Sequence, residues 1–135
     1  MGEPTFTITE LSREFNVTPR AIRHYEAQGL ISPERVGQSR IYSKRDRTRL
    51  KLTLRGKRLG LSLVEIKELI DTYDTAPDES SQLVKVLAVL AKRRQALMQQ
   101  REDIEAVLGE LDAFERQCRD ILAVAKSRRG PRRSA

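Results

Sequence analysis

The side chains best suited to chemistry in this sequence are cations, and they gather in two places. Arg20, Arg23 and His24 recur at the spacing of one helical face. Residues 40–58 include nine basic residues and one acid, and core packing does not explain a helix that is basic all round. Forked guanidinium groups on a rigid support suit the phosphates or the base edges of a nucleic acid. The two clusters therefore favour a polyanionic partner, and a merely solvated basic face is the alternative.

Patterns for catalysis are absent from the sequence. His24 is the only histidine and Cys118 the only cysteine, so neither a nucleophile–base pair nor a metal triad has candidates. Gly56 and Gly60 lack the spacing and the flanking strand of a nucleotide-binding loop. A single cysteine also excludes a disulfide framework within the chain. We therefore expect no enzyme activity, no cofactor and no metal site.

The net charge of +7 is unevenly distributed along the 135 residues. Residues 1–74 hold 14 Lys and Arg against 10 Asp and Glu, and the last ten residues hold five basic side chains and no acid. Basic surfaces bind polyanions by releasing condensed counterions, so the front of the chain is the candidate surface. The sequence contains no apolar run of about 18 residues, the length needed to span a membrane, and its polar N-terminus lacks a signal-peptide core. These features predict a cytoplasmic protein without a membrane partner.

Two short helices are expected to carry the first basic cluster. Thr7 and Glu10 have the spacing of a capping box at the start of one helix. A Thr-Pro pair at 18–19 is a start signal for the next helix, and Gly29 is suited to end it. Ile22 would face inward on this second helix. Two helices joined by a tight turn predict a helix-turn-helix, whose second helix enters the major groove of DNA.

The second cluster follows a predicted hairpin. Residues 36–39 read as a turn between Leu30-Ile31 and a return strand at 40–42, which together would form a small wing. Ser43 then caps a helix that runs to about Arg58, and Ser62 caps another that ends near residue 74. We expect a winged helix-turn-helix head over residues 1–74, followed by a linker at 75–80.

A heptad repeat dominates the rest of the chain. Apolar residues alternate at spacings of four and three, which indicates a coiled-coil seam over residues 81–125 that is about 65 Å long across positions 83–125. The head is too short to cover such a helix, so the seam needs a partner, most simply a second copy; a helix folded back on the head is the alternative. Residues 126–135 would form a basic disordered tail. The predicted dimerisation residues are Leu83, Leu87, Leu90, Leu97, Ile104, Leu108, Leu111, Cys118 and Leu122.

Three segments resemble signatures of the MerR family of transcription regulators. They are residues 18–30 (TPRAIRHYEAQGL), residues 40–42 (RIY) and residues 60–66 (GLSLVEI). The resemblance implies a mainly α fold, with the winged head followed by a long antiparallel coiled-coil dimerisation helix. It also implies that a homodimer binds a palindromic promoter element in double-stranded DNA and distorts an overlong spacer so that RNA polymerase can align with both promoter elements.

The resemblance also implies roles for individual side chains. The recognition helix would contact DNA, the wing would add contacts, and the following helix would bind the phosphate backbone. Tyr25 has a competing role in the core, and its ring and its hydroxyl could serve both. The expected DNA-binding residues are Thr18, Arg20, Arg23, His24, Tyr25, Arg40, Tyr42, Arg45, Arg49, Arg55 and Lys57.

The signal that would control the regulator is open. Metal-responsive members of the family carry paired cysteines, whereas Cys118 is alone here, so we expect it to be a small hydrophobe in the seam. A metal or redox sensor that joins two Cys118 thiols across a dimer is the alternative. Residues 50–60 are similar to the LiuR-like branch, which implies a metabolite effector such as an acyl-CoA. A coiled-coil adaptor whose basic head docks acidic proteins is the rival to a DNA-binding function.

Overall fold

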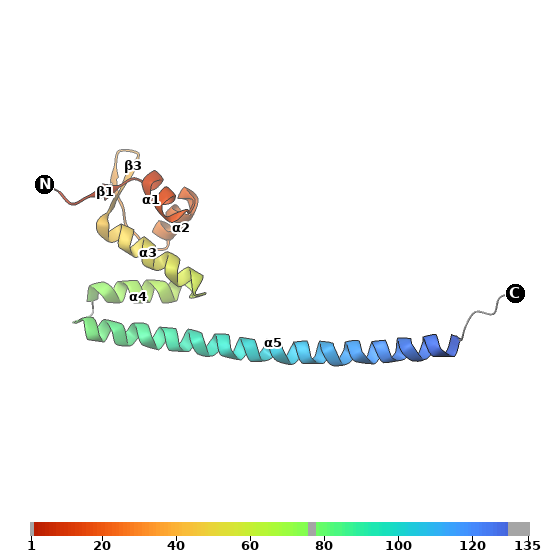
Figure 1. Cartoon of the computed structure of the whole chain (residues 1–135). Coiled ribbons are helices and arrows are strands. Elements are labelled where there is room, and N and C mark those ends of the chain that lie inside the picture. The colour runs from red at the N-terminus through yellow and green to blue at the C-terminus, as the bar shows by residue number, and fades with distance from the viewer. Residues whose placement is uncertain (1, 76–77, 130–135) are drawn as a thin grey trace. The chain divides into compact units, whose positions relative to one another are not determined.

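The computed structural model describes residues 2–75 and 78–129. Contacts divide the chain into two compact units, which meet between Arg93 and Arg94. The first, here called the head unit, contains α1 (Ile8–Phe15), α2 (Pro19–Ala27), α3 (Lys44–Arg58) and α4 (Leu63–Thr75), as well as the strands β1 (Thr5–Phe6), β2 (Glu34–Val36) and β3 (Ser39–Ser43). It also contains the beginning of α5 (Glu79–Arg129), the helix that continues into the second unit (Figure 1).

Side-chain caps fix the beginnings of the short helices, as the sequence predicts. Thr7 and Glu10 form a reciprocal capping box, in which the Thr7 amide donates to Glu10 Oε1 over 3.0 Å. Thr18 Oγ1 accepts a hydrogen bond from the Ala21 amide, and Pro19 occupies the first turn of α2. Ser43 opens α3 through the same kind of capping box as Thr7. Each cap satisfies amide groups that a helix terminus leaves without partners.

The wing is a hairpin within a small sheet of order β1-β3-β2. The predicted turn is confirmed, but the first strand begins at Glu34 and not at Leu30-Ile31. Leu30 and Ile31 are 0% and 2% exposed, because Gly29 at φ 78° turns the chain and sends both side chains into the core. The pairing of β1 with β3 was not predicted, since a two-residue strand has no periodicity to detect.

The core of the head unit is made by apolar faces of all its helices. Leu11, Ile22 and Leu50 have no exposed surface, and they pack with Ile66 in one cluster. At Gly56, α3 and α4 approach so closely that a Cβ would lie 2.7 Å from an Ile66 side-chain carbon. Glycine at this position therefore permits the contact that holds α4 against α3.

The beginning of α5 also belongs to this unit. It runs beside α4 (Figure 1), Val89 packs against the core, and Arg93 Nε donates to the Leu59 carbonyl oxygen over 2.9 Å. The head unit thus extends about fifteen residues into the helix that the heptad assigned wholly to dimerisation. The heptad did not indicate this contact, because the same apolar spacing serves a partner helix or the head.

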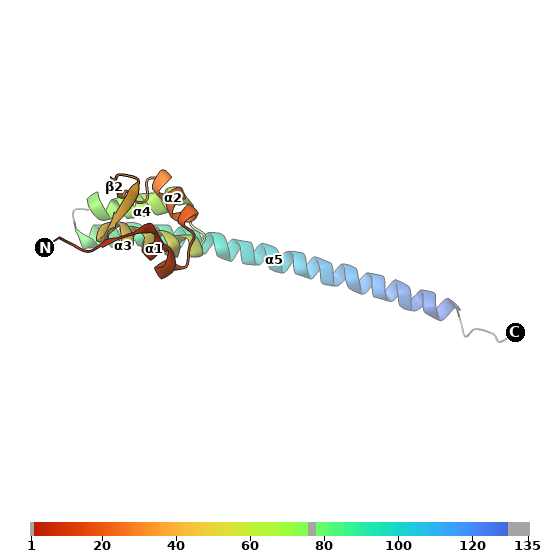
Figure 2. The ribbon, with the colours of Figure 1, turned by 90° about the horizontal axis from the view of Figure 1, so that it is seen from above.

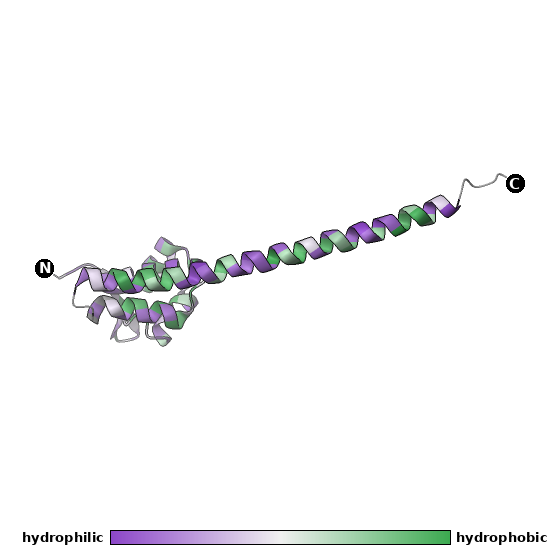
Figure 3. Cartoon of the chain, turned by 90° about the horizontal axis from the view of Figure 1, so that it is seen from below, coloured by the Kyte–Doolittle hydropathy of each residue, from purple (hydrophilic) through white to green (hydrophobic). Residues whose placement is uncertain are grey.

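The described residues of the second unit, 94–129, form a continuous helix about 54 Å long. Apolar and polar residues alternate along it (Figure 3). The heptad positions expose much of their surface, for example 54% for Ile104 and 58% for Leu111, and Cys118 is exposed as well. The helix includes residues 126–129 of the predicted tail, and residues 130–135 lie outside the described residues. A search of the described residues finds no helix that is long and apolar enough to cross a membrane.

Candidate nucleic-acid interface

The exposed face of α2 carries the first group of predicted DNA-binding side chains. Ile22 and Tyr25 turn into the core, and this orientation leaves Arg20, Arg23 and His24 exposed on the opposite side. None of these three forms an ion pair among residues 2–75 and 78–129. Long, unpaired donors near the beginning of an exposed helix are what a recognition helix presents to base edges.

Thr18 and Tyr25 have structural roles that the predicted contacts must accommodate. The Thr18 hydroxyl oxygen caps α2, as described above, and the residue is exposed. Tyr25 is only 9% exposed, and its ring lies 6.0 Å from that of His24 between centroids. Its side chain is therefore mostly a core element of α2.

The wing side chains Arg40 and Tyr42 point to the same side of β3, because they are two residues apart on a strand. Tyr42 has no exposed surface, so its expected contact with DNA would require a rearrangement of the core. Burial raises the pKa of its hydroxyl, which has no hydrogen-bond partner among the described residues. Arg40 remains partly exposed, and its Nε donates to Glu26 Oε2 of α2 over 2.8 Å.

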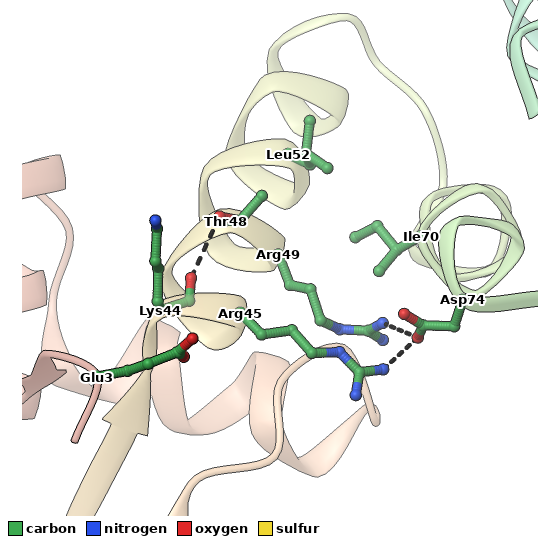
Figure 4. A pocket seen from close by; sticks show the side chains of 8 residues that line it. All are labelled: Glu3, Lys44, Arg45, Thr48, Arg49, Leu52, Ile70 and Asp74. Carbon is green, nitrogen blue, oxygen red and sulfur yellow. Dashed lines mark hydrogen bonds and ion pairs between the residues drawn. The ribbon is translucent and has the colours of Figure 1, made fainter. Parts of the chain in front are cut away.

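The first half of α3 directs its arginines to internal partners. Arg45 and Arg49 converge on the carboxylate of Asp74 at the end of α4 (Figure 4). Arg49 also reaches Asp71 over 3.0 Å, and its Nε donates to the Leu30 carbonyl oxygen over 2.6 Å. With a side chain only 12% exposed, Arg49 ties α4 to α3, so the phosphate contact predicted for it would require some of these internal bonds to open.

Arg47 is similarly occupied. Its guanidinium group pairs with the Glu14 carboxylate and lies 5.9 Å and 5.6 Å from the ring centres of Phe6 and Phe15. A cation over aromatic faces is attracted by their π electrons. The hydrogen bond from Arg47 holds the pKa of Glu14 below its usual value. This cluster joins α3 to α1 and β1.

The second half of α3 presents cations that are not paired. Arg55 and Lys57 are exposed, and so are their neighbours Lys51 and Arg58. None of the four forms an ion pair within the described part of the chain, and together they rim a shallow hollow over Phe15, Val17 and Leu54. The structure thus separates the nine basic residues of the segment 40–58 into two groups. Four form ion pairs (Arg40, Arg45, Arg47 and Arg49), and five form none among the described residues (Lys44, Lys51, Arg55, Lys57 and Arg58).

The partners of the paired arginines are the residues that the sequence reasoning missed. Glu26, Asp71 and Asp74 lie 14 to 29 positions from Arg40, Arg45 and Arg49, so helical or strand spacing gives no sign of their pairs with these arginines. Among the described residues, no group of three or more His, Cys, Asp or Glu side chains is placed to hold a metal ion.

Comparisons with known proteins cover most of the chain. A family model described as MerR HTH family regulatory protein matches residues 6–73, and one described as MerR, DNA binding matches residues 47–114. The HTH-type transcriptional regulator ZntR of Escherichia coli is 31% identical over 114 residues, which are 82% of this chain and 74% of the relative.

Solved structures give the same result. A MerR family transcriptional regulator from Bacillus cereus is 28% identical with a TM-score of 0.64, and the match covers 84% of this chain and 82% of the other. The N-terminal part of MtaN, a multidrug transporter activator of Bacillus subtilis, is 25% identical with a TM-score of 0.65, covering 81% of this chain and 96% of the other.

Proposed function

The chain belongs to the MerR family of DNA-binding transcription regulators, and on that premise we propose how it acts. It binds a palindromic promoter element as a homodimer, and it distorts the promoter spacer so that RNA polymerase can engage both promoter elements. The exposed heptad positions of α5 support the dimer, because an apolar seam that is left exposed in one chain favours a second helix.

The observation that carries this proposal is the distribution of unpaired cations. Arg20 and Arg23 project from α2, and Arg55 and Lys57 project from the end of α3, without acidic partners among the described residues. Groups that are already unpaired can bind phosphates without first breaking internal ion pairs. The first two suit base edges, and the latter two suit the backbone.

The test is a titration of duplex DNA at several salt concentrations, with a palindromic site selected from random sequence and a scrambled duplex as its control. A dimer with about eight phosphate contacts gives a log–log slope of affinity against salt near −7. The rival function, an adaptor that docks acidic proteins, predicts no preference between the duplexes. Equal affinity for both duplexes at every salt concentration would refute the proposal.

Two variants separate base recognition from binding of the phosphate backbone. Arg23→Ala should relax sequence discrimination, because Arg23 lies on the base-facing side of α2. Lys57→Ala should weaken binding to both duplexes alike and reduce the magnitude of the salt slope by about 0.9 per lost contact. Losses of equal size on both duplexes for both variants would contradict this division.

The effector that we propose is a metabolite such as an acyl-CoA, on the strength of the resemblance of residues 50–60 to the LiuR-like branch. Titration calorimetry with an acyl-CoA, with free coenzyme A and with Zn²⁺ distinguishes this proposal from its rival. A heat of Zn²⁺ binding that disappears in a Cys118→Ser variant would favour a sensor that joins two thiols. Zn²⁺ would then take the place of the metabolite as the proposed effector.

A further inference from the structure

The carboxylate of Glu26 occupies an unfavourable place. It lies in the last turn of α2, where the partial negative charge of the helix end repels an acid. It is one helical turn beyond Arg23, on a helix whose exposed face is proposed to meet DNA phosphates. Neither helix stability nor affinity for a polyanion explains an acid at this position.

The wing beside α2 has an unfavourable feature of its own (Figure 2). Arg35 of β2 and Arg40 of β3 are direct cross-strand partners in a hairpin with only three paired positions. Like charges that face each other across two strands destabilise the pairing. The hairpin thus carries a repulsion that involves Arg40, the arginine that the wing is expected to present to DNA.

The contacts of Glu26 account for both its own position and the opposed pair of arginines. Its Oε2 accepts a hydrogen bond from Arg40 Nε over 2.8 Å, and its Oε1 accepts one from an Arg35 terminal nitrogen over 3.4 Å. The Glu26 side chain is 18% exposed, so the attraction is less screened than at an open surface. Arg40 is bound through Nε, and no hydrogen bond among the described residues engages its two terminal nitrogens.

We propose that Glu26 is a positioning residue for DNA recognition: it clamps the two opposed wing arginines to the recognition helix, and so fixes the distance between the base-reading face of α2 and the backbone contact of the wing. The inference rests on the proposed function. Glu26 does not touch DNA in this account. It orients Arg40, whose terminal nitrogens then meet a phosphate only when α2 is in register with the bases.

Three variants separate positioning from charge. Glu26→Gln removes the clamp and one negative charge, Glu26→Asp keeps the charge but shortens the side chain by one methylene, and Glu34→Gln removes an exposed charge of the same wing that has no ion-pair partner among the described residues. Each is titrated, as the full chain, against the selected and the scrambled duplex at several salt concentrations.

Both Glu26 variants should lose about tenfold in the ratio of selected to scrambled affinity, the size expected when one base-reading contact is misplaced. Glu26→Gln should also bind scrambled DNA more tightly and steepen the salt slope by up to about 2 per dimer, since each subunit gains one cation for phosphate. Glu34→Gln should tighten both duplexes alike and keep the ratio.

A second measurement reads the clamp without DNA. Amide ¹⁵N relaxation of residues 34–43 should show increased motion on the picosecond-to-nanosecond timescale in both Glu26 variants and not in Glu34→Gln. Unchanged wing motion, or a ratio that stays at the wild-type value in Glu26→Asp, overturns the proposal. A wild-type protein that does not prefer the selected duplex refutes the proposed function instead, and the relaxation result then still decides whether the clamp exists.

Discussion

Replacing Arg49 with alanine should destabilise the head unit strongly and have little effect on DNA affinity. The Arg49 side chain is 12% exposed, and its Nε donates to the Leu30 carbonyl oxygen over 2.6 Å. A hydrogen bond from a charged donor contributes about 1.5–3 kcal/mol, and its loss leaves a buried acceptor unsatisfied. The pairs with Asp71 and Asp74 involve half-exposed carboxylates and add at most about 1 kcal/mol each. We therefore expect the free energy of unfolding to fall by about 2–4 kcal/mol.

Arg45→Ala is the matched control for this experiment. Arg45 pairs with the same Asp74 from the same face of α3, but its side chain is 66% exposed and its one ion-pair partner among the described residues is that carboxylate. Its loss should cost less than about 1 kcal/mol. The measurement is urea unfolding followed by circular dichroism at a fixed protein concentration, because dimerisation makes stability depend on concentration. A difference between the two variants smaller than about 0.5 kcal/mol would show that the Leu30 contact does not carry the stability we assign to it.

Three further changes test other parts of the account. Lys67 and Arg49 hold the pKa of Asp71 below its usual value. The ionised carboxylate therefore stabilises the fold above the unfolded pKa near 3.8, and this contribution is lost as the pH falls through the lower folded pKa. Asp71→Asn should flatten the acid side of the profile of unfolding free energy against pH, measured from pH 6 to 2. Gly60→Ala should destabilise by about 1–3 kcal/mol in thermal melts, chiefly because φ is +81°, a backbone conformation that L side chains rarely adopt, and a Cβ would also displace the flexible Arg93 guanidinium. Gly109→Ala on open helix should instead stabilise by up to about 1 kcal/mol. Ile104→Asn in the exposed seam should shift sedimentation toward monomer and lower DNA affinity together, and a variant that remains fully dimeric would contradict the seam.

Local signals in the sequence were sufficient for most of the fold. The capping boxes at Thr7 and Ser43 are formed by residues three positions apart, so a short window contains the whole interaction. The inward face of α2 follows from helical periodicity in the same way. The predicted beginning of the wing was wrong because the apolar pair Leu30 and Ile31 is typical of a strand. Their burial comes instead from a turn at Gly29 and from contacts with distant helices.

The proposed interface was less predictable than the fold, and the reason is electrostatic. Residue type identifies a cation, but only the folded chain decides whether an acid lies beside it. Arg47 and Lys51 both lie in the predicted basic helix, about one turn apart. Arg47 is nevertheless bound between Glu14 and two aromatic rings, while Lys51 has no ion pair among the described residues. The acid that distinguishes them is 33 positions away in sequence from Arg47.

A paired cation and a free cation therefore contribute differently to binding, even when they share one helix. The counterion atmosphere of a duplex responds to charge that can approach its phosphates, and an arginine that is neutralised within the head supplies little of it. The pairs at Arg45 and Arg49 bring the end of α4 onto α3, and this arrangement holds the scaffold from which Arg55 and Lys57 project. The basic residues that form these internal ion pairs are less able to bind phosphates. The unpaired ones are held by the rigid scaffold in a defined orientation. On this reasoning the affinity of the head for DNA follows the number of unpaired cations, and its selectivity follows the ion pairs that hold the reading helix and the wing in place.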